Sequence, residues 1–167
     1  MDLTRNPISP LPLLIHSHGW GIPMDQRMKE AFFEQVQKEP FAKKFGLKLI
    51  EIDTGYSKVE MTFTPDMENL FQMAHGGALF ALIDEAFETA SNSHGTLAVA
   101  LHMNITYLSP PSPGSRLIAE AREVHQTQKT SLCEIKVHDE QHRPIATCQA
   151  LAYRKGVPHP FLKKEKK

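Results

Sequence analysis

The chain has 167 residues, of which 41% are hydrophobic and 23% charged, a composition typical of one globular domain. Its 19 basic and 19 acidic residues cancel, so no overall field attracts nucleic acid or a membrane surface. The two cysteines, Cys133 and Cys148, are too few for a disulfide framework and indicate a reducing compartment. No apolar run is long enough to span a bilayer, and we expect a cytoplasmic protein.

The chain begins without a regular pattern. Residues 1–23 contain four prolines and no periodicity, which predicts an extended or disordered N-terminal arm. His16 and His18 in this arm lack a third ligand nearby, so we expect no metal ion, and we expect no cofactor. From Met24 onward a helical periodicity appears, and the predicted helix ends before Pro40.

Strand patterns begin after Gly46. The runs LKLIEID and SKVEMTF alternate and are separated by TGY, which predicts a hairpin. A long helix is predicted from Gly76 to about Asn92, closed near Gly95. Four β-like runs follow, TLAVALHMNITYL, SRLIAEAREVH, TSLCEIKVHD and PIATCQALAYRK. The connecting loops PPSPG, QTQK and EQHR are short, which favours antiparallel neighbours.

The long helix is expected to lie in the core. Its first turns are apolar nearly all round, which is typical of a buried helix. Alternate residues of VALHMNITY are apolar, so one face of the sheet needs a partner, and this helix is the only long apolar element available. We predict an α+β fold in which an antiparallel sheet wraps around a central helix. Residues 24–156 form a single domain, followed by a basic tail, 157–167.

Polar residues are regularly spaced around the start of the long helix. Asn69 stands six residues before His75, which precedes two glycines, and Asp84 follows nine residues after the histidine. With MNITYLSP, this pattern resembles the hotdog-fold acyl-CoA thioesterases, and most of all their PaaI-like (phenylacetic-acid-degradation type) branch. The blocks NLFQMAHGGALFALIDEAF, MNITYLSP and the QKT turn carry this resemblance over residues 41–156. It implies a hotdog fold, hydrolysis of an acyl-CoA, and a homodimer or homotetramer.

Asp84 is the first candidate catalytic residue. On a helix it lines up with Phe80 and Phe87, so its carboxylate should be partly desolvated and more basic. The resemblance implies a general base acting on water, or a nucleophile acting through an anhydride, and the residues do not separate these roles. From the residues alone, a rim charge paired with Lys or Arg is the alternative. Glu85 and Glu88 are expected to point elsewhere, solvated or at a subunit contact.

The two glycines supply the second candidate feature. The first N–H groups of a helix have no intrahelical partner and suit a developing oxyanion. The resemblance implies this role for the Gly76 N–H, and Gly77 would let substrate approach the backbone. The alternative is that both merely permit a tight turn into the helix. His75 and Asn69 resemble family residues that position substrate or water and brace the loop, with a helix cap and a loop asparagine as the alternatives.

Two basic residues are candidate contacts to the phosphates of coenzyme A. Lys129, at the QKT turn, matches a basic position of the family, and Arg154 ends the last strand. Both could bind phosphates, or could be solvated surface charges. Many relatives carry a hydroxyl on the strand before MNITYLSP, where this chain has Ala100, which makes water positioning less complete.

The spacing of the candidate residues predicts a site shared by two subunits. Gly76 and Asp84 are eight residues apart, about 12 Å along a helix. A thioester carbonyl must lie within roughly 3 Å of both the donor and the attacking group. The two groups are therefore expected to meet across a dimer with two-fold symmetry.

Two other functions stay open, and the acyl group is not defined. One is a hotdog dehydratase or hydratase. The other is a non-catalytic acyl-CoA-binding module. Hotdog regulators of the latter kind normally carry a DNA-binding segment. The single helix from Met24 lacks the second helix that a helix-turn-helix needs, so we expect no nucleic acid.

Overall fold

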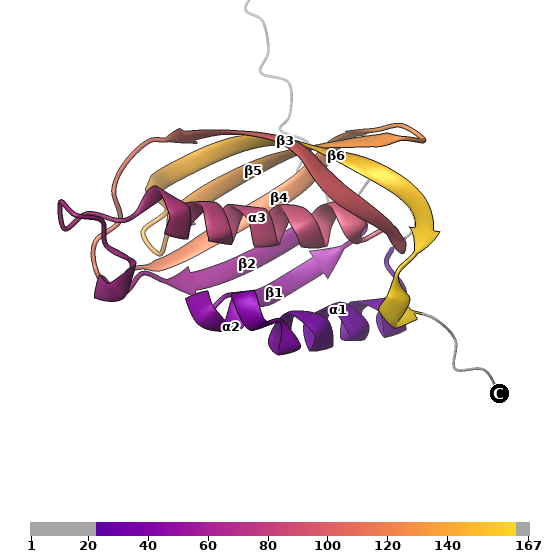
Figure 1. Ribbon diagram of the computed structural model, residues 1–167, viewed down its shortest axis with the longest axis horizontal. Coiled ribbons are helices and arrows are strands. Elements are labelled where there is room, and N and C mark those ends of the chain that lie inside the picture. Colours follow the sequence, from indigo (N-terminus) through magenta and orange to yellow (C-terminus); the bar gives the residue numbers. More distant parts are fainter. Residues whose placement is uncertain (1–22, 163–167) are drawn as a thin grey trace, which may run out of the picture.

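A curved antiparallel sheet wraps one side of a long central helix (Figure 1). The computed structural model describes residues 23–162. The sheet order is β1-β2-β4-β5-β6-β3, and all neighbours are antiparallel. The strands are β1 (Lys48–Asp53), β2 (Tyr56–Thr62), β3 (Thr96–Tyr107), β4 (Arg116–Gln126), β5 (Thr130–Asp139) and β6 (Pro144–Pro158). This order confirms the predicted fold class and the predicted β1–β2 hairpin.

The central helix is α3 (Gly76–Asn92), with the bounds that the sequence predicted. It contacts every strand of the sheet, so it forms the middle of the core. Its side chains Leu82, Ile83 and Phe87 are fully buried in that core. Burying each such side chain contributes about 1.5–3 kcal/mol to the free energy of unfolding. The helix is thus held by packing on nearly all of its sides.

Two further helices lie along the lower side of the molecule in Figure 1. The first, α1 (Gln26–Lys38), begins at the capping side chain of Asp25 and ends before Pro40, as predicted. The second, α2 (Pro40–Phe45), was not predicted, because six residues are too few to show a helical period. Gly46, with φ of 65°, ends it in the left-handed conformation that glycine adopts without strain.

Regular structure continues past residue 156, where the domain was predicted to end. Strand β6 continues to Pro158, and a short 3₁₀ turn, η2 (Pro160–Leu162), follows it. His159 is buried and its Nε2 lies 2.9 Å from the carbonyl oxygen of Asn92, while the ring of Phe161 lies 5.3 Å from that of Phe32. These contacts attach the start of the tail to α1 and α3. The predicted N-terminal arm, with His16 and His18, lies outside the described residues except for its last position.

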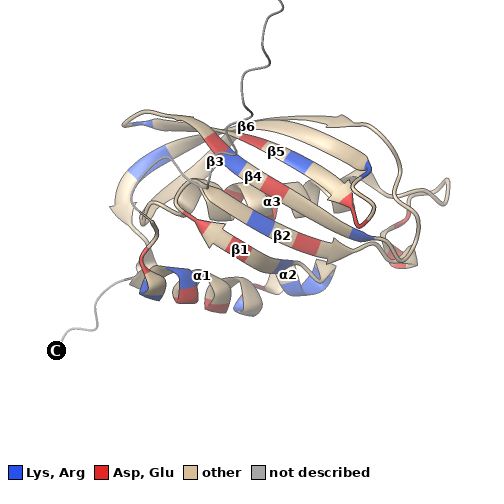
Figure 2. Ribbon diagram, turned by 180° about the vertical axis from the view of Figure 1, so that it is seen from behind, with Lys and Arg blue, Asp and Glu red and all other residues tan. Residues whose placement is uncertain are grey.

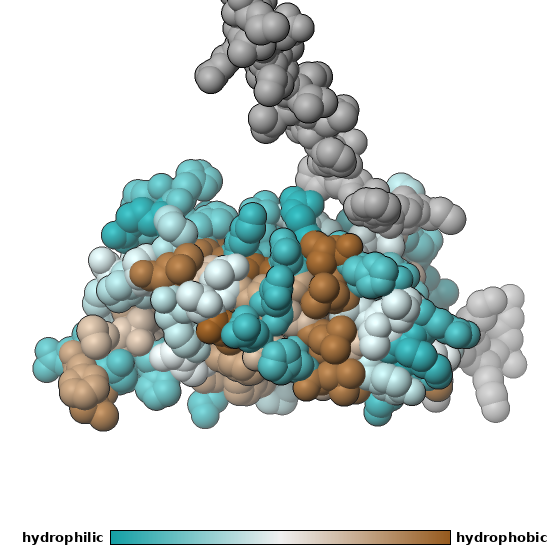
Figure 3. Space-filling view, turned by 90° about the horizontal axis from the view of Figure 1, so that it is seen from above, coloured by the Kyte–Doolittle hydropathy of each residue, from teal (hydrophilic) through white to brown (hydrophobic). Residues whose placement is uncertain are grey.

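Strand β3 lies at the edge of the sheet, paired only with β6 among the strands between residues 23 and 162. Its expected apolar face is only partly buried. Met103 and Ile105 are half-buried, whereas Leu101 and Tyr107 are exposed. A register shift between Ala100 and His102 interrupts the strict alternation. Figure 3 looks onto the upper edge of Figure 1, where β3 and β6 lie, and hydrophobic patches stand there among hydrophilic groups.

The outer face of the sheet carries alternating charges (Figure 2). Lys58, for example, lies 3.4 Å from a carboxylate oxygen of Glu51 on one side and of Glu120 on the other. Such solvent-facing ion pairs contribute about 0–1 kcal/mol each to the free energy of unfolding. The charges of this face therefore keep it in contact with water and add little to stability. Within residues 23–162, no helix is long and apolar enough to cross a membrane.

Candidate active site

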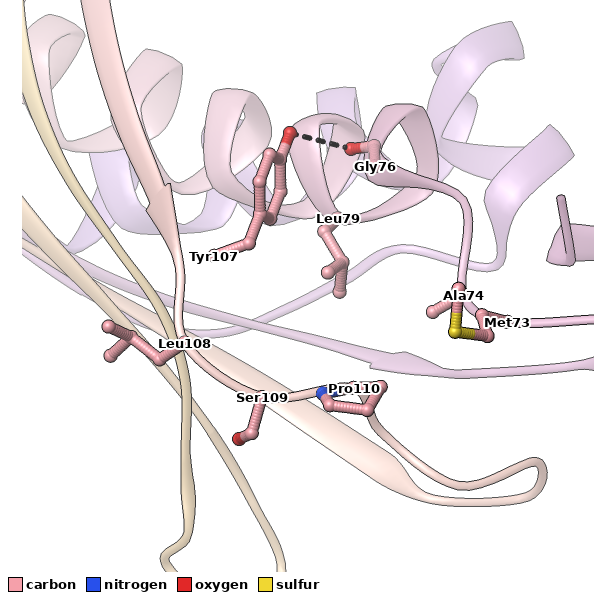
Figure 4. Close-up of a pocket in the computed structure, with 8 residues that line it drawn as sticks. All are labelled: Met73, Ala74, Gly76, Leu79, Tyr107, Leu108, Ser109 and Pro110. Atoms are coloured by element: carbon pink, nitrogen blue, oxygen red, sulfur yellow. Dashed lines mark hydrogen bonds between the residues drawn. The ribbon is translucent and has the colours of Figure 1, made fainter. Parts of the chain in front are cut away.

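A pocket of about 290 Å³ lies beside the first turn of α3 (Figure 4). Two of the sequence blocks form this pocket. One is NLFQMAHGGALFALIDEAF, which contains the loop before α3, and the other is MNITYLSP, which contains the end of β3. Figure 4 shows Leu79 pointing into the pocket from the helix and Tyr107 reaching toward the helix from β3. The lining is mostly apolar and consists of Met73, Ala74, Gly76, Leu79, Tyr107, Leu108, Ser109 and Pro110. It suits a hydrocarbon chain or the pantetheine arm of a thioester.

The hydrogen bonds at the start of α3 leave one backbone donor available. The Nδ1 atom of His75 accepts from the N–H of Gly77 at 2.8 Å, which caps the helix. The hydroxyl of Tyr107 donates to the carbonyl oxygen of Gly76 at 3.1 Å. The N–H of Gly76 has no acceptor within the described part of the chain. This N–H is therefore a free donor at the positive end of the helix dipole, on the wall of the pocket.

Both glycines stand in close contact with neighbouring side chains. A Cβ on Gly76 would lie 3.1 Å from the hydroxyl oxygen of Tyr107, and a Cβ on Gly77 would lie 3.0 Å from Nδ1 of His75. Neither glycine has a positive φ, so backbone conformation does not require them. The close approach of Tyr107 to Gly76 and of the His75 ring to Gly77 thus explains why two glycines stand at the start of this helix. The sequence did not single out Tyr107, although it stands within MNITYLSP.

Asn69 braces the loop that leads into α3. Its Oδ1 accepts from the N–H of Phe71 at 2.8 Å and from the N–H of Met73 at 3.3 Å. Its own N–H donates to the carbonyl oxygen of Met73 at 2.7 Å. Within this loop Gln72 has a positive φ of 58°, an uncommon conformation for a residue other than glycine. The asparagine side chain therefore holds one wall of the pocket in place.

Asp84 lies on a second pocket, of about 220 Å³, between α3 and the beginning of β3. Its carboxylate is half-buried and has no hydrogen bond or ion pair to any residue from 23 to 162. Burial raises the pKa of this carboxyl above its usual range. Ala100, the position at which the resemblance led us to expect a hydroxyl, lines the same pocket. The pairing with Lys or Arg that was the alternative is absent among these residues.

Within one chain, Asp84 and Gly76 do not share a pocket. No residue lines both cavities, and the two positions are separated by two turns of α3. Asp84 borders the start of β3, whereas Gly76 meets its end through Tyr107. A single chain therefore holds its two candidate half-sites, one beside Gly76 and one beside Asp84, in separate pockets.

The basic residues lie at the Asp84 end of β3. Tyr153 on β6 pairs with Val99 on β3, and Val99 lines the pocket of Asp84. On its other side Tyr153 pairs with Thr130 on β5, the residue after Lys129. Lys129 is exposed, and its Nζ lies 5.9 Å from the ring centroid of Tyr153. The sheet register thus brings Lys129, Arg154 and the border of the Asp84 pocket to one end of the sheet.

Arg154 already has an intramolecular partner. Its Nη1 donates to the carbonyl oxygen of Thr127 at 2.9 Å, and its backbone N–H donates to the carbonyl oxygen of Lys129 at 2.9 Å. The guanidinium therefore braces the β4–β5 turn and keeps other N–H groups for a ligand. Lys129 has a more freely available charge.

Comparison with known proteins identifies the family. A family model described as the thioesterase superfamily matches residues 71–146. The acyl-coenzyme A thioesterase PaaI of Escherichia coli K12 is 37% identical over 120 residues, which are 72% of this chain and 86% of that protein. The chain belongs to the thioesterase superfamily. The matched segment contains both half-sites, from the loop before α3 to the beginning of β6.

Solved structures confirm the fold of this thioesterase. The E. coli PaaI protein from the phenylacetic acid degradation operon gives a TM-score of 0.77 at 32% identity, over 81% of this chain and 98% of that one. A variant of the phenylacetic acid degradation protein PaaI from Thermus thermophilus gives 0.67 at 34% identity, over 70% and 99%. The resemblance stated from the sequence is thus confirmed, including its PaaI-like branch and the thioester hydrolase class.

Glu85 does not lie where the sequence predicted. It was expected to be solvated or at a subunit contact, but its residue is 3% exposed and packs inside the chain. Its carboxylate lies beside those of Glu39 and Glu88. The reason for the error is that α1 and α2 cover this face of α3, which the pattern of α3 does not reveal.

Proposed function

We propose that this thioesterase hydrolyses an acyl-CoA to a free acid and coenzyme A. The observation that carries the proposal is the carboxylate of Asp84, half-buried beside a pocket and without a protein partner among the described residues. Carboxylates that only stabilise a fold are normally paired. An unpaired one whose pKa is raised by burial is suited to accept a proton or to attack a carbonyl carbon.

The roles follow from the chemistry of a thioester. Asp84 either removes a proton from a water molecule that attacks the carbonyl carbon, or attacks it directly to give an anhydride that water then cleaves. The N–H of Gly76 donates to the oxyanion that forms. The C–S bond breaks, and the coenzyme A sulfur leaves as a thiolate that takes up a proton. His75, Asn69 and Gly77 act by shaping the turn that presents this donor.

The working site is formed by two subunits. The half-sites of one chain are separated by eight residues of α3, about 12 Å, whereas one carbonyl must reach both. The free edge of β3 and its exposed apolar residues Leu101, Tyr107 and Leu108 support a homodimer joined along this edge. A two-fold axis there would create two equal sites, and pairing of dimers would give a homotetramer.

Coenzyme A would be bound by both ends of this composite site. The apolar pocket beside Gly76 fits the acyl chain or the pantetheine arm. Lys129 is exposed at the end of the sheet that borders Asp84, where it can contact phosphates, and Arg154 supports the turn that presents it. The acyl group is proposed to be medium-sized to large, or aromatic.

One observation favours a second candidate, a non-catalytic acyl-CoA-binding module. Ala100 borders Asp84 and has no hydroxyl to orient a water molecule. A site with the carboxylate but without this hydroxyl would bind the ligand and turn it over slowly.

The two candidates are separated by measuring thiol release with a thiol-reactive dye. Acyl-CoA substrates of increasing chain length, together with an aromatic one, are offered to the purified chain, and ligand binding is measured by calorimetry. We expect release from at least one member of the set, and loss of release in Asp84→Asn. Binding of acyl-CoA without any release would support the module instead, and neither binding nor release would contradict both.

A further inference from the structure

Three carboxylates meet between α3 and the α1–α2 junction. Glu85 and Glu88 lie one turn apart on α3, and Glu39 lies at the junction of α1 and α2. One carboxylate oxygen of each lies within 4.8 Å of the others. This acidic cluster, Glu39 with Glu85 and Glu88, is separate from the lining of the pocket beside Gly76.

The cluster has no compensating charge in the described part of the chain. Glu85 is 97% buried, as its 3% exposure implies, and its carboxylate has no hydrogen bond to any residue from 23 to 162. No Lys or Arg of that segment forms an ion pair with any of the three. Burial, and then the charges of Glu39, Glu88 and Asp84, raise the pKa of Glu85 to about 8. A buried carboxylate aimed at two others requires a proton or a cation.

The surroundings leave room for an ion and its water. The three glutamates border a pocket of about 150 Å³ that Gln35 also lines, with an amide oxygen as a further possible ligand. Glu88 is exposed, so the pocket opens to solvent there. The nearby His159 is already in contact with the carbonyl oxygen of Asn92. The available ligands are therefore oxygens.

We propose that Glu39, Glu85 and Glu88 bind a divalent cation that prefers oxygen ligands, namely Mg²⁺, Ca²⁺ or Mn²⁺. Carboxylates suit these hard cations, which complete their coordination with water, whereas zinc sites usually contain Cys or His. The ion would connect the α1–α2 junction to the central helix (Figure 1). It should therefore stabilise the packing of the N-terminal helices on the core.

The sequence predicted no metal site because its ligands are distant along the chain. Glu39 belongs to an amphipathic segment and Glu85 to the core helix, and only packing brings them together. Glu88 also lines the pocket of Asp84, so the test measures cation binding and stability rather than activity.

The test uses the full chain after treatment with a chelator and dialysis. Calorimetry and thermal unfolding are measured with MgCl₂, CaCl₂ and MnCl₂ in turn. We expect one site per chain with a Kd of about 1 mM or tighter for at least one cation, and a higher Tm in its presence. Glu85→Gln should weaken this affinity at least about tenfold, as expected for loss of a charged ligand. Glu34→Gln, an exposed position on α1, should bind as the parent does.

Two results would overturn the proposal. One is no heat and no rise in Tm at about 10 mM of any of the three cations, well above such Kd values. The other is equal affinity in the parent, Glu85→Gln and Glu88→Gln, which would mean binding elsewhere on the surface. Glu88→Gln is included because its exposed side chain should tolerate the change even if Glu85→Gln does not fold. If the parent chain binds no cation and Glu85→Gln is more stable than the parent, then protons, not a metal ion, neutralise the cluster.

Discussion

Asp84 and Glu85 are adjacent on α3 but face different parts of the molecule. Successive residues on a helix differ in direction by about 100°. Asp84 therefore borders the start of β3, whereas Glu85 packs toward the α1–α2 junction. Neither has a basic partner among residues 23–162, and burial raises the pKa of both. Two neighbouring carboxylates thus have different proposed roles, Asp84 as base or nucleophile and Glu85 as ligand of an ion.

Replacing the Asp84 carboxylate should remove most of the activity. Asp84→Asn keeps the size and a hydrogen-bonding group but cannot act as a base or nucleophile. We expect kcat to fall at least about 100-fold, the range for loss of a positioned base. Glu30→Gln, which removes an exposed charge on α1, should leave kcat unchanged. A folded Asp84→Asn variant, checked by circular dichroism, that retains activity within a few-fold would exclude Asp84 as the catalytic residue.

Lys129 should matter for substrates that carry phosphates. We expect Lys129→Ala to raise KM for acyl-CoA about fivefold, corresponding to about 1 kcal/mol for an exposed charge pair. KM for a short acyl thioester without the nucleotide should not change. The matched control is Lys136→Ala, an exposed lysine on β5. Equal effects on both substrates would argue against a phosphate contact.

At the scale of elements, one carboxylate ties three segments together. Glu123 on β4 accepts a short hydrogen bond from the Ser131 hydroxyl on β5, and its Oε1 lies 3.0 Å from Nε2 of His94, just after α3. Its backbone N–H donates to the carbonyl oxygen of Gly55 in the β1–β2 turn. Burial raises the pKa of Glu123, but the hydrogen bonds with His94 and Ser131 outweigh it, so the net pKa is lowered.

This lowered pKa predicts a loss of stability in acid. A carboxyl whose folded pKa is below its unfolded value contributes its full stabilisation above about pH 4.3, the unfolded value for Glu. That contribution is lost as the pH falls through the folded pKa. At pH 7 we expect Glu123→Gln to unfold about 3–6 °C below the parent, and the difference should shrink below about pH 4. Thermal unfolding from pH 3 to 8 checks this, with the exposed Glu134→Gln as control. A difference that is constant with pH would contradict it.

Elements with strong local signals were predicted, and those without them were not. Helix α3 was located correctly because a capping residue precedes a long apolar segment. Helix α2 was missed because it has only six residues. The predicted last strand ended at Lys155, where the β-like pattern stops, whereas β6 continues to Pro158. The register shift in β3 has no sequence signal that the alternation rule can detect.

For the whole molecule, the separation of the two candidate half-sites supports the proposed homodimer. The pocket beside Gly76 and the pocket beside Asp84 lie two helical turns apart, and β3, which borders both, has a free edge. A second copy that joins this edge in antiparallel orientation would bring the Asp84 end of one β3 to the Gly76 end of the other.

Complementation between variants tests this arrangement. Asp84→Ala should give inactive dimers, and so should the double variant Asn69→Ala with His75→Ala, which damages the side of the site that contains Gly76. After subunit exchange, half of the dimers are mixed, and each has one intact site and one with both defects. About a quarter of all sites should therefore recover activity under two-fold symmetry.

The control mixes Asp84→Ala with Asp84→Asn, which damage the same side and should not recover. Mass spectrometry confirms that mixed dimers form. If they form and the first mixture stays inactive, each site lies within one chain, and the proposed role of the β3 edge is wrong.

The order of elements, the burial of α3 and the apolar neighbours of Asp84 follow from the sequence, because periodicity and capping are local properties of the chain. The same holds for the thioesterase resemblance, which three short blocks of the chain carry. Other features depend on segments that are distant in sequence. The approach of Tyr107 to Gly76, the separation of the two pockets and the meeting of Glu39 with Glu85 are set by the packing of the sheet and helices, which no local pattern encodes.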